Sequence, residues 1–216
     1  MHHLRETSAR KTQNKTRHNY WSRSKITTRQ REALNRHPGS IIWLTGLSGA
    51  GKSTIAVKLE QALYRLRRHT YILDGDNIRH GLCSDLGFSH DDRTENIRRI
   101  GEAARLFADA GIICIAAFIS PYRADRDLAR RIAPQGKFLE VYVNASLEIC
   151  EQRDPKGLYA RARSGELKNF TGVSAPYEPP LKPEIELDTN ELSVTECVGI
   201  ILKRLDKLLP PANKRR

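Results

Sequence analysis

The chain has 216 residues, of which 39% are hydrophobic and 29% are charged, and its formal net charge is +12. This length suits one well-buried domain with appendages, because two full domains would each have too little apolar material for a core. The longest apolar run, residues 112–119, is far shorter than the ~20 residues that cross a bilayer, so we expect neither a transmembrane helix nor a membrane partner.

The positive charge lies at the two ends of the chain. Lys and Arg outnumber Asp and Glu by 10 to 2 in residues 1–38 and by 6 to 1 in residues 203–216, whereas residues 39–202 hold 21 against 22. A nucleic-acid function would have to reside in these tails, and we expect no nucleic-acid partner. We therefore divide the chain into a basic N-terminal arm (1–38), a central domain (39–202) and a basic C-terminal tail (203–216).

The compartment is indicated by the arm and by the cysteines. The arm lacks the apolar core of a secretory signal, so we interpret it as solvated and partly disordered, with an organelle transit peptide as the alternative. Cys83, Cys114, Cys150 and Cys197 form no C-x-x-C pair, which favours reduced, partly buried thiols in a cytoplasmic protein. We expect no metal site made of His or Cys.

Short apolar runs and helical patterns alternate along the central domain. After the first apolar run, a helix is expected over residues 53–67. Apolar residues recur at helical spacing in residues 97–107 and, more weakly, in residues 147–151. Strands separated by helices predict an α/β fold in three layers, with a central parallel sheet flanked by helices. The expected strands are residues 41–45, 70–73, 112–118, 138–143 and 185–187.

One segment interrupts this alternation. Residues 153–183 are dense in Lys, Arg, Gly and Pro and show no apolar periodicity. A loop of this length is usually functional or disordered, and an enzyme that moves a phosphoryl group must exclude water. We therefore predict a mobile lid over an active site.

A phosphate-binding motif follows the first strand. Residues 46–53 match G-x-x-x-x-G-K-S/T between a strand and a helix, the context that a P-loop requires. Lys52 should reach the β and γ phosphates of ATP, and the hydroxyl of Ser53 should bind Mg²⁺. A turn without a ligand does not call for Lys and Ser together. The expected ATP contacts are Gly46, Leu47, Ser48, Gly49, Ala50, Gly51, Lys52, Ser53 and Thr54.

Two acids follow the second strand. Asp74 and Asp76 should face the P-loop, because the carboxyl ends of parallel strands share one edge of the sheet. The third strand ends in Ile119 and Ser120 without an acid, so these aspartates replace the usual Walker B residue. We expect Asp74 to bind Mg²⁺, partly through water, and Asp76 to accept a proton from an attacking hydroxyl. A helix cap is the plainer alternative for either acid.

The residues around this site closely resemble the adenylylsulfate kinase family of P-loop kinases. The similarity runs in order from about residue 41 to residue 189 and is more specific than a lone P-loop. Its motifs are L-D-G-D-N-I-R-H-G-L at 73–82, D-L-G-F-S at 85–89, D-R at 92–93 with E-N-I-R-R at 95–99, F-I-S-P-Y-R at 118–123, R-D-P-K-G-L-Y at 153–159, F-T-G at 170–172 and A-P-Y-E at 175–178.

The resemblance implies transfer of the ATP γ-phosphoryl group to the 3′-hydroxyl of adenosine 5′-phosphosulfate, in sulfate assimilation. It also implies a homodimer, coupling to ATP sulfurylase, and contact of Arg153 with the adenine of ATP. Ser120 joins Lys52, Asp74 and Asp76 as a catalytic position, and we expect it to bind the acceptor and not to carry the phosphate. The implied acceptor contacts are Arg79, Phe88, Arg93, Asn96, Ile119, Ser120, Lys168 and Phe170.

Plainer interpretations of these residues stay open. Arg93 and Asn96 could form a solvated helical face, and Phe88 or Phe170 could simply anchor a loop. Two other functions are also open: a P-loop kinase for another small metabolite, and a non-catalytic nucleotide-sensing module. The first has no reason to keep the acceptor residues together, and the second should lose the residues that hold phosphate.

Overall fold

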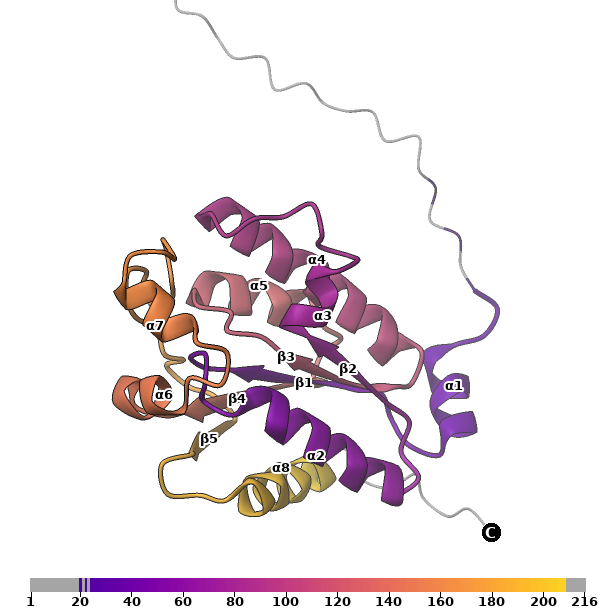
Figure 1. The fold of residues 1–216 in the computed structure, drawn as a ribbon. Coiled ribbons are helices and arrows are strands. Elements are labelled where there is room, and N and C mark those ends of the chain that lie inside the picture. Colours follow the sequence, from indigo (N-terminus) through magenta and orange to yellow (C-terminus); the bar gives the residue numbers. More distant parts are fainter. Residues whose placement is uncertain (1–19, 21, 23, 209–216) are drawn as a thin grey trace, which may run out of the picture.

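The computed structural model describes residues 20, 22 and 24–208, which form a sheet with helices on both faces (Figure 1). The sheet has five strands in the order β2-β3-β1-β4-β5, and every neighbouring pair is parallel. The predicted parallel sheet is confirmed, because each expected strand lies within one residue of the observed bounds. The strands are β1 (Ser40–Thr45), β2 (Thr70–Asp74), β3 (Ile113–Ala117), β4 (Phe138–Asn144) and β5 (Ile185–Asp188).

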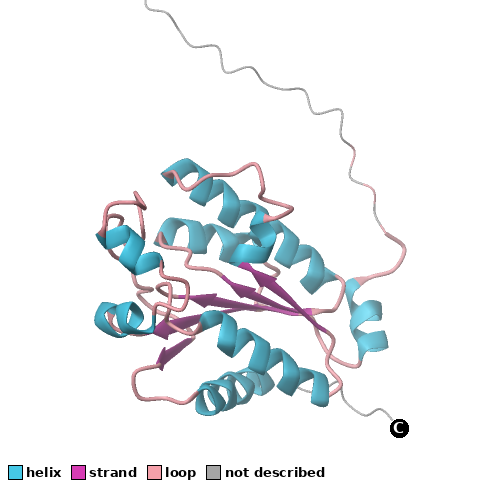
Figure 2. Ribbon diagram, viewed as in Figure 1, coloured by secondary structure: helices cyan, strands magenta, loops and turns pink. Residues whose placement is uncertain are grey.

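The helices enclose the sheet in the three layers that the sequence predicts (Figure 2). One face is covered by α2 and α8 and the other by α4 and α5, while α6 and α7 lie near the carboxyl ends of the strands (Figure 1). The helices are α1 (Thr28–Asn35), α2 (Lys52–Arg65), α3 (Gly75–Arg79), α4 (His90–Asp109), α5 (Arg123–Ile132), α6 (Leu147–Arg153), α7 (Leu158–Arg163) and α8 (Val194–Leu208).

Strand β1 shows why a strand at the centre of this sheet is a continuous apolar run. Ile42 and Leu44 pack in the cluster that includes α2 and α8, whereas Ile41 and Trp43 pack in the cluster of α4 and α5. All four side chains are fully buried. A strand that is covered on both faces needs apolar residues at every position, which is typical of a parallel sheet between two helical layers.

The chain is more ordered near its ends than the sequence suggests. Within the basic arm, residues 28–35 form α1, where Arg31 pairs with Asp109 at 2.9 Å and Asn35 Nδ2 donates to Gly111 O at 2.9 Å. At the other end, α8 runs across the boundary that we placed after residue 202, and Leu205 lies in the core. Residues 1–19 and 209–216, which carry much of the tail charge, lie outside the described residues.

The described helices include none with the length and apolar character needed to span a bilayer. The four cysteines are free, and all are fully buried where the sequence predicts partial burial. Among the described residues, no three His, Cys, Asp or Glu side chains gather as a metal-binding group.

Candidate active site

The P-loop lies between the end of β1 and the start of α2, pressed against neighbouring backbone. Gly46 has φ 152°, and a Cβ there would lie 2.3 Å from Val143 O at the end of β4. Gly49 has φ 76°, and its Cβ would lie 2.8 Å from Cys150 O in α6. Both positions therefore require glycine, since a side chain would push the loop away from the sheet edge.

Lys52 places a buried ammonium group inside this loop. Its side chain is in the first turn of α2, and Nζ donates to Leu47 O at 2.6 Å. Burial lowers the pKa of Lys52 to about 8, although the nearby Asp74 carboxylate opposes the shift. A desolvated cation beside the N-terminus of a helix is well suited to hold anionic phosphate oxygens.

Ser53 and Asp74 meet directly, although 21 positions separate them in the chain. Ser53 Oγ donates to Asp74 Oδ2 at 2.7 Å, and Asp74 Oδ1 accepts from Asp76 N at 3.0 Å. Asp74 therefore caps α3, as the plainer alternative expects, and it also faces the P-loop, while its role in binding Mg²⁺ stays a prediction. Two oxygen ligands suit Mg²⁺, which usually takes few protein ligands and completes its shell with water and substrate phosphates.

Asp76 is tied to the lid. Its carboxylate forms an ion pair with Lys156, and both side chains are more than half exposed. An exposed pair of this kind contributes little free energy and can exchange partners readily. Sequence reasoning did not assign a role to Lys156, although it lies inside the R-D-P-K-G-L-Y motif.

Three of the expected acceptor residues form one cluster. The Arg79 guanidinium lies 4.2 Å from the centre of the Phe88 ring, and Arg93 Nε donates to Phe88 O at 3.0 Å. Arg79 also donates to Gly87 O at 2.9 Å, which fixes the loop before α4. The Phe88 ring remains 61% exposed, so one aromatic surface and two cations are presented together.

Arg93 extends this cluster to the lid. Its Nη1 donates to Thr171 Oγ1 at 2.7 Å and its Nη2 donates to Asn169 O at 2.6 Å. Asn96 follows on the same helix and is 4% exposed, and its Nδ2 finds no hydrogen-bond partner among the described residues. A buried amide donor without a partner costs free energy, which suits a position where a ligand supplies the acceptor. The idea of a solvated face does not fit either residue.

Ser120 lies in the core instead of facing the cluster. Its Oγ accepts a hydrogen bond from Trp43 Nε1 at 3.1 Å and donates to Thr45 Oγ1 at 3.0 Å, and the residue is 2% exposed. Ile119 is partly buried, and its carbonyl accepts from Thr45 Oγ1 at 2.7 Å. The backbone of Ser120 has φ 39°, a left-handed conformation that is unusual for a residue with a side chain.

The remaining predicted residues divide between the two sides of the site. Arg153 Nη2 donates to Thr189 O at 2.6 Å, and its Nη1 lies 3.4 Å from Gly49 O, so Arg153 borders the P-loop. Lys168 is exposed on the lid. Phe170 packs edge-on against Tyr159 with a centroid distance of 5.0 Å, so it does not stack with Phe88 in this structure.

Two residues that hold the P-loop were not predicted. Tyr159 in α7 donates to Ser48 O at 2.9 Å, and Thr189 Oγ1, just after β5, donates to Ala50 O at 3.0 Å. Both bonds go to backbone carbonyls, which no motif specifies. The position of Thr189 at the carboxyl end of a strand was the available signal, because that edge holds the rest of the site.

Known proteins are similar to this chain in sequence. A family model described as adenylylsulphate kinase matches residues 38–188. An adenylyl-sulfate kinase of Acaryochloris marina is 57% identical over 187 residues, which cover 87% of this chain and 91% of that protein.

Solved structures also match. The Mycobacterium tuberculosis APS kinase CysC in complex with AMPPNP and APS has a TM-score of 0.75 and 43% identity, covering 78% of this chain and 98% of that one. A hexameric APS kinase from Thiobacillus denitrificans has a TM-score of 0.60 and 33% identity, and the match covers 80% of this chain and 30% of that chain.

Proposed function

Because the chain belongs to the adenylylsulfate kinase family, we propose that it phosphorylates adenosine 5′-phosphosulfate with ATP. The 3′-hydroxyl oxygen attacks the γ phosphorus, the bond to the β–γ bridging oxygen breaks, and ADP leaves. The products are ADP and 3′-phosphoadenosine 5′-phosphosulfate. One observation carries the proposal: the P-loop and the Ser53–Asp74 pair lie near Asp76, which follows the same strand edge.

The donor side is built from backbone amides, two cations and the Ser53–Asp74 pair. The P-loop amides and Lys52 hold the β and γ phosphates, and Lys52 stabilises the charge that develops during transfer. Arg153 borders the loop and is our candidate for contact with the adenine of ATP. Ser53 and Asp74 would hold Mg²⁺, which would neutralise phosphate charge when it is bound.

The acceptor side combines cations, an aromatic ring and a base. Arg79 and Arg93 suit the phosphosulfate anion, the exposed Phe88 ring suits the adenine, and the Asn96 amide offers a buried donor. Asp76 takes the proton of the 3′-hydroxyl and later passes it to water. Its ion pair with Lys156 must open for this step, so Lys156 couples the lid to the base.

The lid residues Lys168 and Phe170 complete the acceptor site on closure. Phe170 would have to leave Tyr159 to stack on the acceptor, which makes lid movement part of the cycle. We assign Ser120 a role in shaping the loop after β3 and retain direct transfer. The burial of its hydroxyl between Trp43 and Thr45 supports direct transfer, because a phosphoserine would need an accessible oxygen.

The two rival functions have less support. A nucleotide-sensing module has no need for Lys52 together with a contact between Ser53 and Asp74. A kinase for another metabolite has no need for the cluster of Arg79, Phe88 and Arg93. The wider predictions stay proposals: a homodimer, a cytoplasmic enzyme and functional coupling to ATP sulfurylase. A hexameric relative supports self-association in general.

Product identification tests the function. The purified chain, ATP, Mg²⁺ and adenosine 5′-phosphosulfate should yield ADP and a 3′-phosphorylated nucleotide in equal amounts, separated by ion exchange and identified by mass spectrometry. Phosphorylation of the acceptor at a position other than the 3′-hydroxyl would contradict the proposal, as would ADP formed without a phosphorylated acceptor.

The lowered pKa of Lys52 predicts a pH dependence on the donor side. Above about pH 8 the free enzyme loses the Lys52 proton, so kcat/KM for ATP should fall as pH rises. Bound phosphates favour the charged form, so kcat at saturating ATP should change much less over the same range. Initial rates between pH 6.5 and 9.5, roughly bracketing that pKa, separate the two profiles. Parallel decline of kcat and kcat/KM would argue against this assignment.

Arg93→Ala should weaken acceptor binding. Loss of a charge-assisted contact costs roughly 1.5 to 3 kcal/mol, so the KM for adenosine 5′-phosphosulfate should rise about ten- to a hundredfold. The KM for ATP should stay near the wild-type value. Arg98→Ala is the matched control, because Arg98 lies on the same helix but pairs with Glu95 on the outside. Equal kinetics for the two variants would show that Arg93 does not contact the acceptor.

A further inference from the structure

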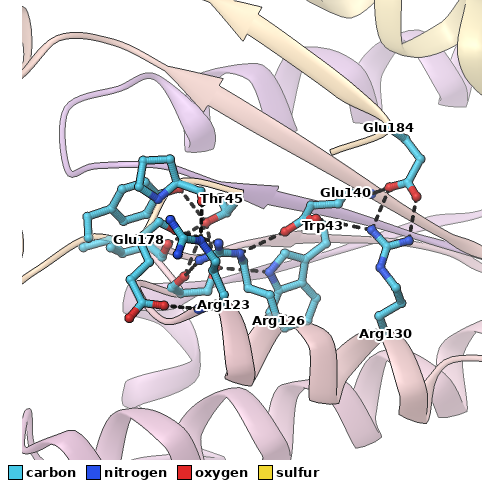
Figure 3. Close-up of polar contacts among 12 residues, drawn as sticks. Trp43, Thr45, Arg123, Arg126, Arg130, Glu140, Glu178 and Glu184 are labelled. Atoms are coloured by element: carbon cyan, nitrogen blue, oxygen red, sulfur yellow. Dashed lines mark hydrogen bonds and ion pairs between the residues drawn. The ribbon is translucent and has the colours of Figure 1, made fainter. Parts of the chain in front are cut away.

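Arg126 of α5 is a buried cation that the roles above do not use. Its side chain is 2% exposed, and burying a guanidinium costs free energy unless it is paired and fully hydrogen-bonded. Its Nε donates to Glu140 Oε1 at 2.9 Å, so β4 supplies the opposite charge (Figure 3). The Tyr177 ring lies 5.8 Å from the same guanidinium.

The other donors of Arg126 go to two backbone carbonyls beside the proposed site. Nη1 donates to Ser120 O at 2.6 Å. Nη2 donates to Glu178 O at 2.6 Å (Figure 3). One planar group thus joins the loop after β3 to the end of the lid. Arginine suits this task because its donors are held in a rigid, planar arrangement, whereas lysine offers one point charge.

The end of the lid is fastened to this loop by further bonds. The Glu178 carboxylate accepts from Arg123 N at 2.8 Å, and Arg123 Nε donates to Pro179 O at 2.8 Å. Tyr177 OH lies 3.0 Å from Thr45 Oγ1. Residues 177–179 therefore form a fixed anchor for the segment that carries Phe170, and Arg126 lies at its centre.

Ser120 is the second end of this connection. Its backbone has φ 39°, a conformation that persists for a residue with a side chain only where the surroundings enforce it. The bond from Arg126 to its carbonyl is one restraint, and the bonds of its hydroxyl to Trp43 and Thr45 are the others. A change at Arg126 should therefore alter the loop at residues 119–120 and the lid anchor together.

We propose that Arg126 is a positioning residue that sets the loop at residues 119–120 and the lid anchor at residues 177–179 relative to each other. This inference rests on the proposed function, because the predicted acceptor contacts include Ile119 in that loop and Phe170 on the lid. Loosening this connection should weaken binding of the acceptor and slow its turnover. The affinity of the P-loop for ATP should not change, because Arg126 does not contact the P-loop.

Arg126→Lys tests the geometry while it keeps a cation beside Glu140. The KM for adenosine 5′-phosphosulfate should rise about tenfold, the size of one lost charge-assisted bond, and the KM for ATP should change by less than about twofold. Arg130→Lys is the matched control. Arg130 lies one turn further along α5 and pairs with Glu140 and Glu184, with no bond to Ser120 or Glu178 (Figure 3). This control should lower Tm and leave both KM values unchanged.

The double variant Arg126→Met with Glu140→Leu separates positioning from stability. Removal of both charges avoids an unpaired Glu140, and Arg130 keeps its pair with Glu184, so the double variant should have a higher Tm than Arg126→Met alone. Its KM for the acceptor should remain raised. It also replaces Arg126→Lys if the single variant does not fold. Recovery of the wild-type acceptor KM together with Tm would overturn the proposal, as would equal rises in both KM values for Arg126→Lys. If the wild-type chain itself does not phosphorylate adenosine 5′-phosphosulfate, the proposed function fails first, and this inference falls with it.

Discussion

Lys52→Ala should lower kcat by on the order of 10² to 10³, the usual loss when one preorganised electrostatic stabiliser is removed. The Lys52 ammonium lies in the first turn of α2 inside the P-loop, where it can follow the γ-phosphoryl group from ATP to the acceptor. Alanine removes this charge without adding bulk. Steady-state rates of ADP release at saturating substrates measure the effect.

Lys58→Ala is the control for this variant, because Lys58 is exposed on the same helix. It should keep wild-type kinetics. Removal of a desolvated charge should not unfold the chain, so the Tm of Lys52→Ala should stay close to that of the wild type. Near-normal turnover in Lys52→Ala would contradict the assignment of the P-loop as the phosphate site.

Asp76→Asn should have a lower kcat than the wild type but an unchanged affinity for ATP. An amide cannot take the proton of the 3′-hydroxyl, and loss of a general base typically costs on the order of 10² to 10⁴ in rate. The Ser53–Asp74 contact is untouched by the substitution, so the KM for ATP should stay within about twofold. Initial rates with each substrate varied in turn measure both quantities.

Lys156→Ala is the matched control, since it removes the same ion pair and keeps the carboxylate. It should lose far less rate than Asp76→Asn. The opposite pattern, in which Asp76→Asn loses ATP affinity at an unchanged kcat, would make Asp76 a metal-binding or structural residue.

The centre of the sheet was predictable because β1 and β3 are covered on both faces and are short apolar runs. The edge strand β5 buries only alternate residues. The P-loop fixes the point where the first strand becomes a helix. Helix α5 gave no such signal, because its buried residues are Asp125, Arg126 and Ala129. Two of these are charged, so the apolar periodicity that reveals an ordinary helix is missing.

The lid shows a second limit of sequence reasoning. Residues 158–163 form α7 inside the predicted loop, and Asp154 holds its start by accepting from Leu158 N at 2.8 Å and Tyr159 N at 3.0 Å. Such a short helix depends on this one side chain and on the burial of Tyr159. The helix has too few residues for an apolar period to be visible in the sequence.

The residues of the donor side and of the acceptor side were predicted from different kinds of evidence. The phosphate contacts of the donor side follow from the P-loop motif, and Asp74 follows from its place at the strand edge. Arg153 and the acceptor cluster came from the family resemblance. The structure brings Arg79, Phe88 and Arg93 together but places the Ser120 hydroxyl in the core. No pattern could show this, because the position of Ser120 depends on Trp43 and on Arg126, which lies in the helix that the sequence did not reveal.

A coupled assay of ADP release with three acceptors shows whether the acceptor site is built for adenosine 5′-phosphosulfate. The acceptors are adenosine 5′-phosphosulfate, AMP and shikimate, each varied at saturating ATP. We expect kcat/KM for adenosine 5′-phosphosulfate to exceed that for AMP by at least about tenfold, because AMP lacks the sulfate that we propose Arg79 and Arg93 bind. We expect no turnover of shikimate. Equal rates with AMP or shikimate, or no ADP release with adenosine 5′-phosphosulfate by an enzyme that binds ATP, would contradict the account.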